Sequence, residues 1–280
     1  MNIKSLINQG SIYLKNNDIP TYKIDSEILM MKVIDKDKKY MILNPNKILN
    51  EKKSNYYREL IKSRSYGKPI AYLVGKKSFW KYEFKITEDV LIPRPDTETI
   101  IEQVLKITKE KFKLKVLDIG VGSGCIILSI LKEKSDFNGV GIDLSQKCID
   151  ISKINAQKLG LINRVKFYKS DIDNFNLGKY DLIISNPPYI KTIDLKYLEK
   201  DVIDFEPTNA LNGGLDGLSE IKKVINNSTK LIKKNGKLVL EIAFDQKNLV
   251  VNLLRKKGFY INKTVRDYAN NYRCIISTKI

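Results

Sequence analysis

The amino-terminal part of the chain carries apolar residues at helical spacing and lacks the alternation that marks a half-buried strand. The apolar positions fall into three groups: Leu6, Ile7, Tyr13 and Leu14; Ile28, Leu29, Met31 and Val33; and Leu49, Tyr56, Tyr57, Leu60 and Ile61. This pattern predicts a small bundle of short helices that ends near Gly67.

The hydrophobic period changes after this bundle, at a point marked by Pro69 and Gly75. Two short strands are predicted there, at residues 71–74 and 79–86. They would form a hairpin that joins the helical part to the rest of the chain. Phe79 and Trp80 are predicted to lie in the core of this hairpin.

The next predicted helix follows a proline-rich stretch, Pro93-Arg94-Pro95. Asp96 comes directly after it and is in position to cap a helix over residues 97–112. At this helix start, Arg94 is expected either to pair with Asp96 or Glu98 on the surface or to help close a ligand pocket.

From Lys115 onward, predicted strands and helices alternate, which is typical of a doubly wound parallel sheet. The strands are predicted at residues 116–119, 139–142, 165–168, 180–185 and 236–242, with a closing pair around residues 260 and 274–276. The helices are predicted at residues 125–131, 146–160, 218–232 and 246–256. The predicted fold class is α/β, with a mostly parallel sheet of seven strands preceded by the helical bundle and the hairpin. The predicted domains are residues 1–68, the hairpin linker at 69–92, and the sheet domain at 93–280.

Composition excludes several classes of protein. The 280 residues are 42% hydrophobic, which is enough for a core, and no apolar stretch is long enough to cross a bilayer. The first residues lead into a polar helix and not into a signal sequence. Cys125, Cys148 and Cys274 are widely spaced, so we expect a reducing cytoplasm and neither disulfides nor a metal site. The absence of histidine excludes Ser-His and Cys-His catalytic triads.

The net charge of +18 has two interpretations. A strongly basic chain can carry an electrostatic footprint for RNA or for an acidic partner. The lysines are spread along the whole chain, however, and accompany many asparagines and isoleucines, a mixture that biased base composition in the gene would also produce. Both interpretations stay open at this point.

Several polar or flexible residues follow the predicted strands at the edge where ligands bind in such sheets. After the first strand comes a glycine-rich turn, made of Gly120, Val121, Gly122, Ser123 and Gly124. Asp143 ends the second strand about twenty residues later, where a carboxylate can accept both ribose hydroxyls. Asp171 follows the third strand and could accept from an adenine amino group, with Ile172 packing under the adenine ring.

A dinucleotide site is the nearest alternative for this glycine-rich turn. The spacing here is G-x-G-x-G, whereas dinucleotide sites use G-x-G-x-x-G. In addition, Asp118 lies just before the turn, and its carboxylate would repel a pyrophosphate but suits the cationic end of S-adenosylmethionine. The pattern therefore favours S-adenosylmethionine as the cofactor.

The fourth predicted strand ends in a tetrad, Asn186-Pro187-Pro188-Tyr189. Two consecutive prolines restrict the backbone and hold the residues before them in extended conformations. The Asn186 side-chain carbonyl and the neighbouring main-chain carbonyls are then fixed acceptors that suit a planar –NH2 group, and the Tyr189 ring offers a face for stacking. The alternative is a simple turn that ends the strand, since Asn-Pro is common in turns.

These motifs resemble the protein-glutamine N5-methyltransferases of peptide-chain release factors (the HemK/PrmC family). The resemblance covers nearly the whole chain. It rests on Tyr72-Leu73-Val74-Gly75, Phe79-Trp80, Leu91 to Glu98, Asp118 to Gly124, Asn186 to Tyr189, and Phe205-Glu206-Pro207. Two positions depart from the family pattern, Ala243 and Ala269, where glycine is expected.

The resemblance implies a class I methyltransferase fold with S-adenosylmethionine as cofactor. It also implies a substrate, the glutamine of the Gly-Gly-Gln motif in class 1 release factors, which is methylated on its side-chain nitrogen. Asn186, Pro187 and Tyr189 would then be catalytic, and all four residues of the tetrad, Pro188 included, would bind the substrate amide. Asn186 would also border the cofactor. The helices of residues 1–68 would recognise the release factor, with no membrane and no direct nucleic-acid contact required.

Two other functions remain possible from the sequence. The tetrad also occurs in nucleic-acid methyltransferases that modify exocyclic amines, which must flip a base into the pocket. No separate target-recognition segment is recognisable here. A binding module with a vestigial cofactor pocket is the other alternative, and the intact tetrad, glycine-rich turn and Asp143 argue against it.

Overall fold

The computed structural model describes residues 1–280, which divide into two units. The helical unit comprises Met1–Lys76 together with Glu199–Phe205. The sheet unit comprises Lys77–Leu198 and Glu206–Ile280. A short segment that follows the tetrad in sequence therefore belongs to the helical unit. Neither unit contains a helix with the length and apolar character needed to cross a membrane.

The helical unit contains six helices, four of them in the range where we predicted a helical bundle, before Gly67. These are α1 (Ile3–Asn16), α2 (Tyr22–Ile34), α3 (Lys38–Leu43), α4 (Glu51–Ser65), α5 (Ile70–Val74) and α9 (Lys200–Phe205). Polar side chains cap the amino termini of three of these helices. Asn2 accepts a hydrogen bond from the Ser5 N–H at 2.8 Å, and Asp37 and Asn50 cap α3 and α4 in the same way.

One apolar core joins α1, α2 and α4, and Leu14 and Leu29 are fully buried in it. Gly10 allows α1 to approach α4 closely, because a β-carbon there would lie 2.4 Å from the Tyr57 hydroxyl oxygen. That hydroxyl is in turn 2.6 Å from the Ser26 hydroxyl on α2. Gly10 and the hydrogen-bonded, buried Tyr57 therefore set the spacing of the three helices.

Residues 71–74, which we predicted to be a strand, form most of the short helix α5. Pro69 precedes this helix, and Gly75 ends it with φ +81°, the left-handed conformation that favours glycine at a helix end. The buried face of α5 includes Leu73 and packs on α2 and α4. The prediction was wrong because four apolar residues fit one turn of buried helix as well as a strand.

A hairpin is present as predicted, but its strands are displaced along the chain, and its turn falls within residues 79–86, which we predicted to be one strand. It consists of β1 (Lys76–Phe79) and β2 (Tyr82–Lys85). Phe79 is buried and its ring meets that of Phe84 edge-on, with centroids 6.2 Å apart, as expected for hairpin core. Trp80 instead occupies the turn with φ +56° and is only half-buried. Its ring N–H donates to Glu133 at 2.9 Å, so the core prediction for Trp80 was wrong.

The helix predicted over residues 97–112 is shorter than expected. The observed elements are a 3-10 turn, Pro95–Thr97, followed by α6, Glu98–Ile107. Asp96 makes no capping hydrogen bond, and its carboxylate lies 3.5 Å from the Arg273 guanidinium. Residues 109–112 are all exposed, so no apolar contact stabilises a further turn.

The sheet unit contains a seven-stranded sheet in the order β5-β4-β3-β6-β7-β9-β8. Its strands are β3 (Lys115–Ile119), β4 (Asn138–Asp143), β5 (Val165–Lys169), β6 (Tyr180–Ser185), β7 (Ile232–Glu241), β8 (Phe259–Arg266) and β9 (Tyr272–Lys279). The first five run parallel, and β9 is antiparallel to both of its neighbours. The predicted doubly wound, mostly parallel sheet is confirmed.

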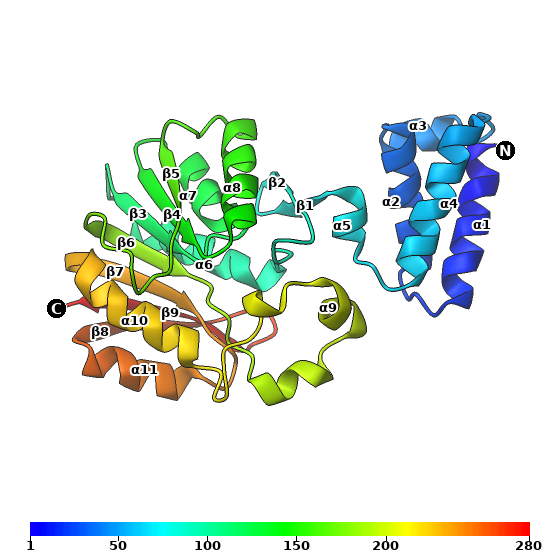
Figure 1. The fold of residues 1–280 in the computed structure, drawn as a ribbon. Coiled ribbons are helices and arrows are strands. Elements are labelled where there is room, and N and C mark those ends of the chain that lie inside the picture. Colours follow the sequence, from blue (N-terminus) through cyan, green and yellow to red (C-terminus); the bar gives the residue numbers. More distant parts are fainter. The chain divides into compact units, whose positions relative to one another are not determined.

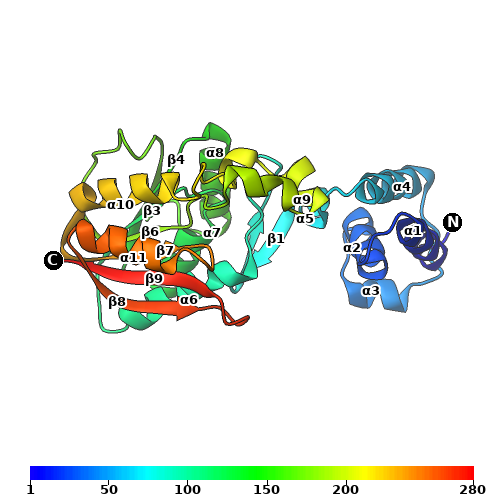
Figure 2. The same ribbon diagram turned by 90° about the horizontal axis from the view of Figure 1, so that it is seen from below.

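Helices cover both faces of this sheet (Figures 1 and 2). One layer contains α6, α7 (Cys125–Glu133) and α8 (Gln146–Lys158), and the other contains α10 (Ser219–Leu231) and α11 (Lys247–Lys256). Because β3 is covered on both sides, its residues after Lys115 form a continuous buried run.

The strand order reverses between β3 and β6. From β3 the chain moves outward through β4 and β5 and then returns to β6 on the other side of β3. Ile119 and Ser185 are partners at the carboxyl ends of these strands, and the Ser185 hydroxyl donates to the Ile119 carbonyl at 2.7 Å. Ligands bind at such a switch point, so the loops after Ile119 and Ser185 border the candidate site.

Candidate functional site

The glycine-rich turn after β3 requires a backbone that other residues adopt at a cost. Gly120, Gly122 and Gly124 have φ values of +76°, +54° and +80°. A β-carbon at Gly120 or Gly122 would meet no atom within 4 Å, so open space lies beside this part of the turn. Val121 and Ser123 are buried within the turn, and the Ser123 hydroxyl has no hydrogen-bond partner.

Asp143 lies at the end of β4 and is held by the backbone. Its two carboxylate oxygens accept from the N–H groups of Gly122 and Ser145, each at 2.9 Å. Burial raises the pKa of this carboxyl, and these hydrogen bonds oppose the rise. Each oxygen keeps a further lone pair, so the carboxylate is oriented and can still accept from a ligand.

Asp118, on β3, is the least satisfied group at this edge of the sheet. Its side chain is 1% exposed, and neither carboxylate oxygen has a hydrogen-bond partner. Burial raises its pKa well above the ordinary range for an aspartate; the nearby Ile127 N–H opposes this rise, and the charge of Asp143 adds to it. A buried carboxylate without donors is costly unless a cation or donor approaches it. This buried carboxyl lies two residues before the glycine turn, and its charge suits the cationic end of S-adenosylmethionine.

Asp171 and Ile172 follow β5 on the outer side of β4. Asp171 is half-buried, and its carboxylate accepts from the Asp173 N–H at 3.0 Å in a tight turn. Ile172 is buried in the core cluster that also contains Ile119 and Ile142, residues on the two preceding strands. The predicted adenine contacts of this pair stay a prediction.

The tetrad after β6 is tied to two other segments of the sheet unit. The Asn186 amide nitrogen donates to the Thr97 hydroxyl oxygen at 3.2 Å, and the Tyr189 hydroxyl donates to Glu241 at the end of β7 at 3.3 Å. Gln246 holds the backbone beyond the tetrad, because its side-chain nitrogen donates to the Tyr189 carbonyl at 3.1 Å. Pro187 is buried between these anchored ends.

Our sequence interpretation missed Thr97, Glu241 and Gln246. Glu241 carries a recognisable signal, since it is a charged residue that directly follows the apolar run Leu238, Val239 and Leu240 at the end of β7. Thr97 lies within the stretch that supports the family resemblance, but nothing in its spacing points to Asn186, which lies 89 residues away. Gln246 carries no comparable signal.

The structure corrects the predicted partners of Arg94. Its guanidinium pairs with Glu206, which is 6% exposed and also accepts from the Ile92 N–H at 3.3 Å. Asp96 pairs instead with Arg273, and Glu98 accepts from the Trp80 N–H at 2.7 Å. A buried carboxylate attracts the arginine more strongly than two half-buried ones that have other partners, because its alternative is to remain unpaired. The Ile-Pro-Arg-Pro and Phe-Glu-Pro motifs are thereby joined.

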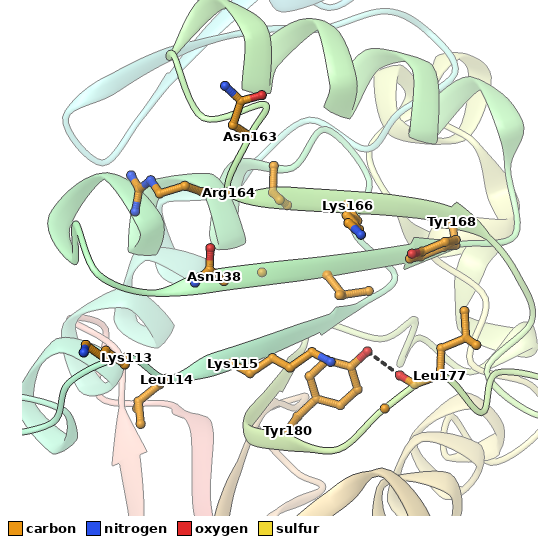
Figure 3. Close-up of a pocket in the computed structure, with 14 residues that line it drawn as sticks. Lys113, Leu114, Lys115, Asn138, Asn163, Arg164, Lys166, Tyr168, Leu177 and Tyr180 are labelled. Atoms are coloured by element: carbon orange, nitrogen blue, oxygen red, sulfur yellow. Dashed lines mark hydrogen bonds between the residues drawn. The ribbon is translucent and has the colours of Figure 1, made fainter.

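A separate cavity of about 510 Å³ lies at the amino ends of β3, β4 and β5, away from the glycine turn (Figure 3). Its basic side chains are Lys113, Lys115, Arg164 and Lys166. Arg164 is a structural residue, since its guanidinium donates to the Leu131 carbonyl at 2.7 Å and to three further carbonyls beyond α7. Lys115 lies 4.9 Å from the Tyr180 ring centroid. These internal contacts account for two of the four charges.

Comparisons with known proteins agree with the fold and the motifs. The PrmC N-terminal domain family matches residues 5–75, and a methyltransferase domain family matches residues 110–273. A protein named release factor glutamine methyltransferase from Buchnera aphidicola (subsp. Acyrthosiphon pisum) is 37% identical over 279 residues, which cover 100% of this chain and 99% of the relative. One of the same name from Clostridium acetobutylicum is 36% identical over 282 residues, with the same coverage.

Among solved structures, a ribosomal protein L11 methylase from Lactobacillus delbrueckii subsp. bulgaricus shares the fold. Its TM-score is 0.50 at 17% identity, over 73% of this chain and 90% of that one. The methyltransferase domain makes this chain an S-adenosylmethionine-dependent methyltransferase. Since the full-length relatives exceed 30% identity over the whole chain, the protein belongs to the release factor glutamine methyltransferase family.

Proposed function

We propose that this enzyme methylates the side-chain amide nitrogen of the glutamine in the Gly-Gly-Gln motif of class 1 peptide-chain release factors. The observation that carries the proposal is the anchoring of Asn186. Its amide nitrogen is occupied by Thr97, so its carbonyl oxygen is left to accept from a substrate –NH2 group. Family membership supports the choice of a glutamine amide over other amines.

The residues that would hold the cofactor lie at the ends of β3, β4 and β5. Asp118 would face the cationic end, the backbone from Gly120 to Gly124 would approach it closely, and Asp143 would accept from the ribose hydroxyls. Asp171 and Ile172 would border the adenine. When bound, S-adenosylmethionine supplies an electrophilic methyl group whose transfer to nitrogen leaves S-adenosylhomocysteine.

The tetrad would orient the substrate amide. An amide nitrogen is a weak nucleophile because its lone pair is delocalised into the carbonyl. Asn186 Oδ1 and the Pro187 carbonyl would each accept one of its N–H groups, and Pro188 and Tyr189 would bound the pocket, with the tyrosine ring against the amide plane. This arrangement holds the nitrogen in line and favours the positive charge that builds on it. The alkylated nitrogen is acidic enough to lose its extra proton to water, so no histidine base is required.

We further propose that residues 1–68 recognise the release factor. The helical unit carries a groove of about 310 Å³ between α1 and α4. It is lined by Leu6, Gln9, Gly10, Tyr13, Tyr57, Arg58, Ile61 and Lys62. The double substitution Arg58→Glu with Lys62→Glu should raise KM for the release factor and leave the Kd for cofactor unchanged. Lys52→Glu with Lys53→Glu, on the same helix and outside the groove, is the matched control.

We place the enzyme in the cytoplasm. Its cysteines are free and buried, and burial raises the pKa of the Cys148 thiol to about 12, so none is poised for disulfide exchange. This usage suits a reducing compartment.

The direct test of the function is to incubate the purified protein with a class 1 release factor and locate any added methyl group by mass spectrometry. A single methyl on the Gly-Gly-Gln glutamine supports the proposal. The control is the same factor with that glutamine replaced by alanine, which should remain unmodified. If radiolabel from the cofactor enters nucleic acid in a lysate and not the release factor, the enzyme is an exocyclic-amine methyltransferase and the proposal fails.

A further inference from the structure

We propose that Thr97 and Glu241 are positioning residues that set the orientation of Asn186 and Tyr189 before the substrate binds. This inference rests on the proposed function, because it assigns both residues to amide recognition by the tetrad. Neither would touch the substrate amide. Each would act through the tetrad residue to which it is connected.

The connections bring together three distant parts of the sheet unit. Thr97 ends the 3-10 turn before α6, Asn186 follows β6, and Glu241 ends β7. Thr97 is 3% exposed and Glu241 is 1% exposed. Both ends of the tetrad are therefore attached to groups that water does not reach.

The direction of the hydrogen bonds follows from the chemistry of the groups. Glu241, when ionised, can only accept, so the Tyr189 hydroxyl must point its proton toward the carboxylate. The Thr97 hydroxyl lies near enough to Glu241 to lower the pKa of that carboxyl, although no hydrogen bond within 3.5 Å joins the two groups. If Thr97 gives its proton to Glu241, its oxygen can only accept from Asn186. The order is then Asn186 to Thr97 to Glu241, with Tyr189 donating from the other side.

This order decides which way the Asn186 amide points. Turning the amide over would present its oxygen to Thr97, and Thr97 would have to donate to that oxygen in place of Glu241. The Thr97 proton would then point away from a buried carboxylate whose second oxygen has no hydrogen bond within 3.5 Å, which is unfavourable. The network therefore disfavours the flipped amide, and Asn186 keeps its oxygen available for the substrate N–H.

Arg273 completes the surroundings of Glu241. Its guanidinium pairs with Asp267 at 3.1 Å and lies 3.5 Å from Asp96. Its positive charge lowers the pKa of Glu241, while burial raises that pKa to about 7. The arginine thus opposes the effect of burial on this carboxyl and favours the ionised form, which can only accept from the Tyr189 hydroxyl.

The test substitutes Thr97 and measures methylation of a class 1 release factor at saturating cofactor. Thr97→Val keeps the shape and removes the hydroxyl, so kcat should fall roughly 10–100-fold, the cost of a misoriented reacting group. KM for the release factor and Kd for the cofactor should change less than about threefold. Thr97→Ser restores the hydroxyl and should recover most of kcat. Thr99→Val, a buried threonine in the first turn of α6, is the matched control and should keep wild-type kcat.

A second readout does not depend on turnover. In protein labelled with ¹⁵N-asparagine, the side-chain –NH2 signals of Asn186 are those missing from Asn186→Ala. They should shift in Thr97→Val and return toward wild type in Thr97→Ser. Wild-type kcat in Thr97→Val, equal kcat in the valine and serine variants, or unshifted Asn186 signals would each overturn the inference. If wild-type protein does not methylate the release factor at all, the proposed function fails, and the spectra still test the hydrogen bond.

Discussion

Two buried carboxylates lie at the carboxyl edge of the sheet, and their surroundings differ. Asp118 on β3 and Glu241 on β7 are each 1% exposed. Neither oxygen of Asp118 has a hydrogen-bond partner. Glu241 accepts from Tyr189 and is surrounded by Thr97 and Arg273, which lower its pKa.

This difference indicates different roles for the two parts of the site: the cofactor end, at Asp118, and the tetrad end, at Glu241. An unpartnered buried carboxylate destabilises the free protein and gains from a ligand that brings positive charge. At the cofactor end, the Asp118 carboxylate lacks a hydrogen-bond partner until the cofactor binds. At the tetrad end, Glu241 already accepts from Tyr189, so the tetrad is oriented before any ligand arrives. Such orientation is the condition for precise positioning of a reacting group.

The largest effect should come from substituting Asn186. This substitution tests whether the tetrad contributes to the chemical step. Asn186→Ala removes the amide acceptor, and turnover should fall roughly a hundredfold or more, as when one oriented polar group is lost at a reacting centre. Cofactor affinity should stay close to wild type. Single-turnover kinetics and calorimetry measure the two quantities separately.

Asn186→Asp refines this test, since a carboxylate keeps an acceptor but changes the charge beside a cationic cofactor. We expect it to bind cofactor and to remain badly impaired. Near wild-type single-turnover rates in both variants would mean that the tetrad is only a turn, and the assignment of the two ends would have to be abandoned.

A substitution of Asp143 should have the opposite effect, since it should weaken cofactor binding and spare the chemical step. Asp143→Ala should weaken binding of S-adenosylmethionine by about 1.5–3 kcal/mol, because charge-assisted hydrogen bonds to the ribose are lost. At saturating cofactor, turnover should be nearly restored. Asp150→Ala, an exposed carboxylate on α8, is the control for a general loss of negative charge. Calorimetry that finds unchanged affinity for Asp143→Ala would contradict the ribose assignment.

Asp118 should make cofactor binding depend on pH. Its pKa is raised in the free protein, so part of the population carries a proton that a cationic ligand must displace. Affinity should therefore increase as the pH rises toward that pKa, by at most about tenfold per pH unit. Asp118→Asn should weaken binding by about tenfold and leave only the smaller dependence due to Asp143, whose pKa is also raised. A pH dependence as steep as wild type in Asp118→Asn would show that another group carries it.

Much of the fold was predictable because long, buried elements carry their own signal. The strands from β3 to β7 lie within a few residues of the predicted bounds, and those from β3 to β6 end at or just before a glycine, aspartate or asparagine. Short elements were not predictable in this way. Residues 71–74 could be a strand or a helical turn, and only packing on α2 and α4 selects the helix.

The candidate site shows the same limit. Asn186 and the glycine turn are local motifs, so the sequence reveals them without knowledge of the fold. Thr97 and Glu241 acquire their connection only when distant segments meet at the end of the sheet. The pairing of Arg94 with Glu206 joins residues 112 apart and could not be inferred from either motif alone.

The smallest expected effect concerns the contribution of Glu241 to the free energy of unfolding. The pKa of Glu241 is raised from 4.5 to about 7 in the folded protein, because burial outweighs Thr97, Arg273 and Tyr189, and the negative charge of Asp96 adds to the rise. Between these values the folded state binds a proton that the unfolded state does not. The free energy of unfolding should therefore fall as pH rises through this window, with a slope of up to about 1.4 kcal/mol per pH unit from this group.

Glu241→Gln cannot titrate, so its free energy of unfolding should lack this contribution. Urea unfolding of both proteins at pH 5.5 and 6.5 should show their difference changing by about 1 kcal/mol, with the glutamine variant gaining relative to wild type at the higher pH. The slope due to Asp118 is common to both proteins and cancels in the difference. Parallel pH dependences would mean that Glu241 is ionised throughout this range, with the donors around it strong enough to offset burial. In that case Glu241 and Asp118 would differ even more than their geometry indicates, since the protein would keep the first carboxylate ionised while burial still raises the pKa of the second.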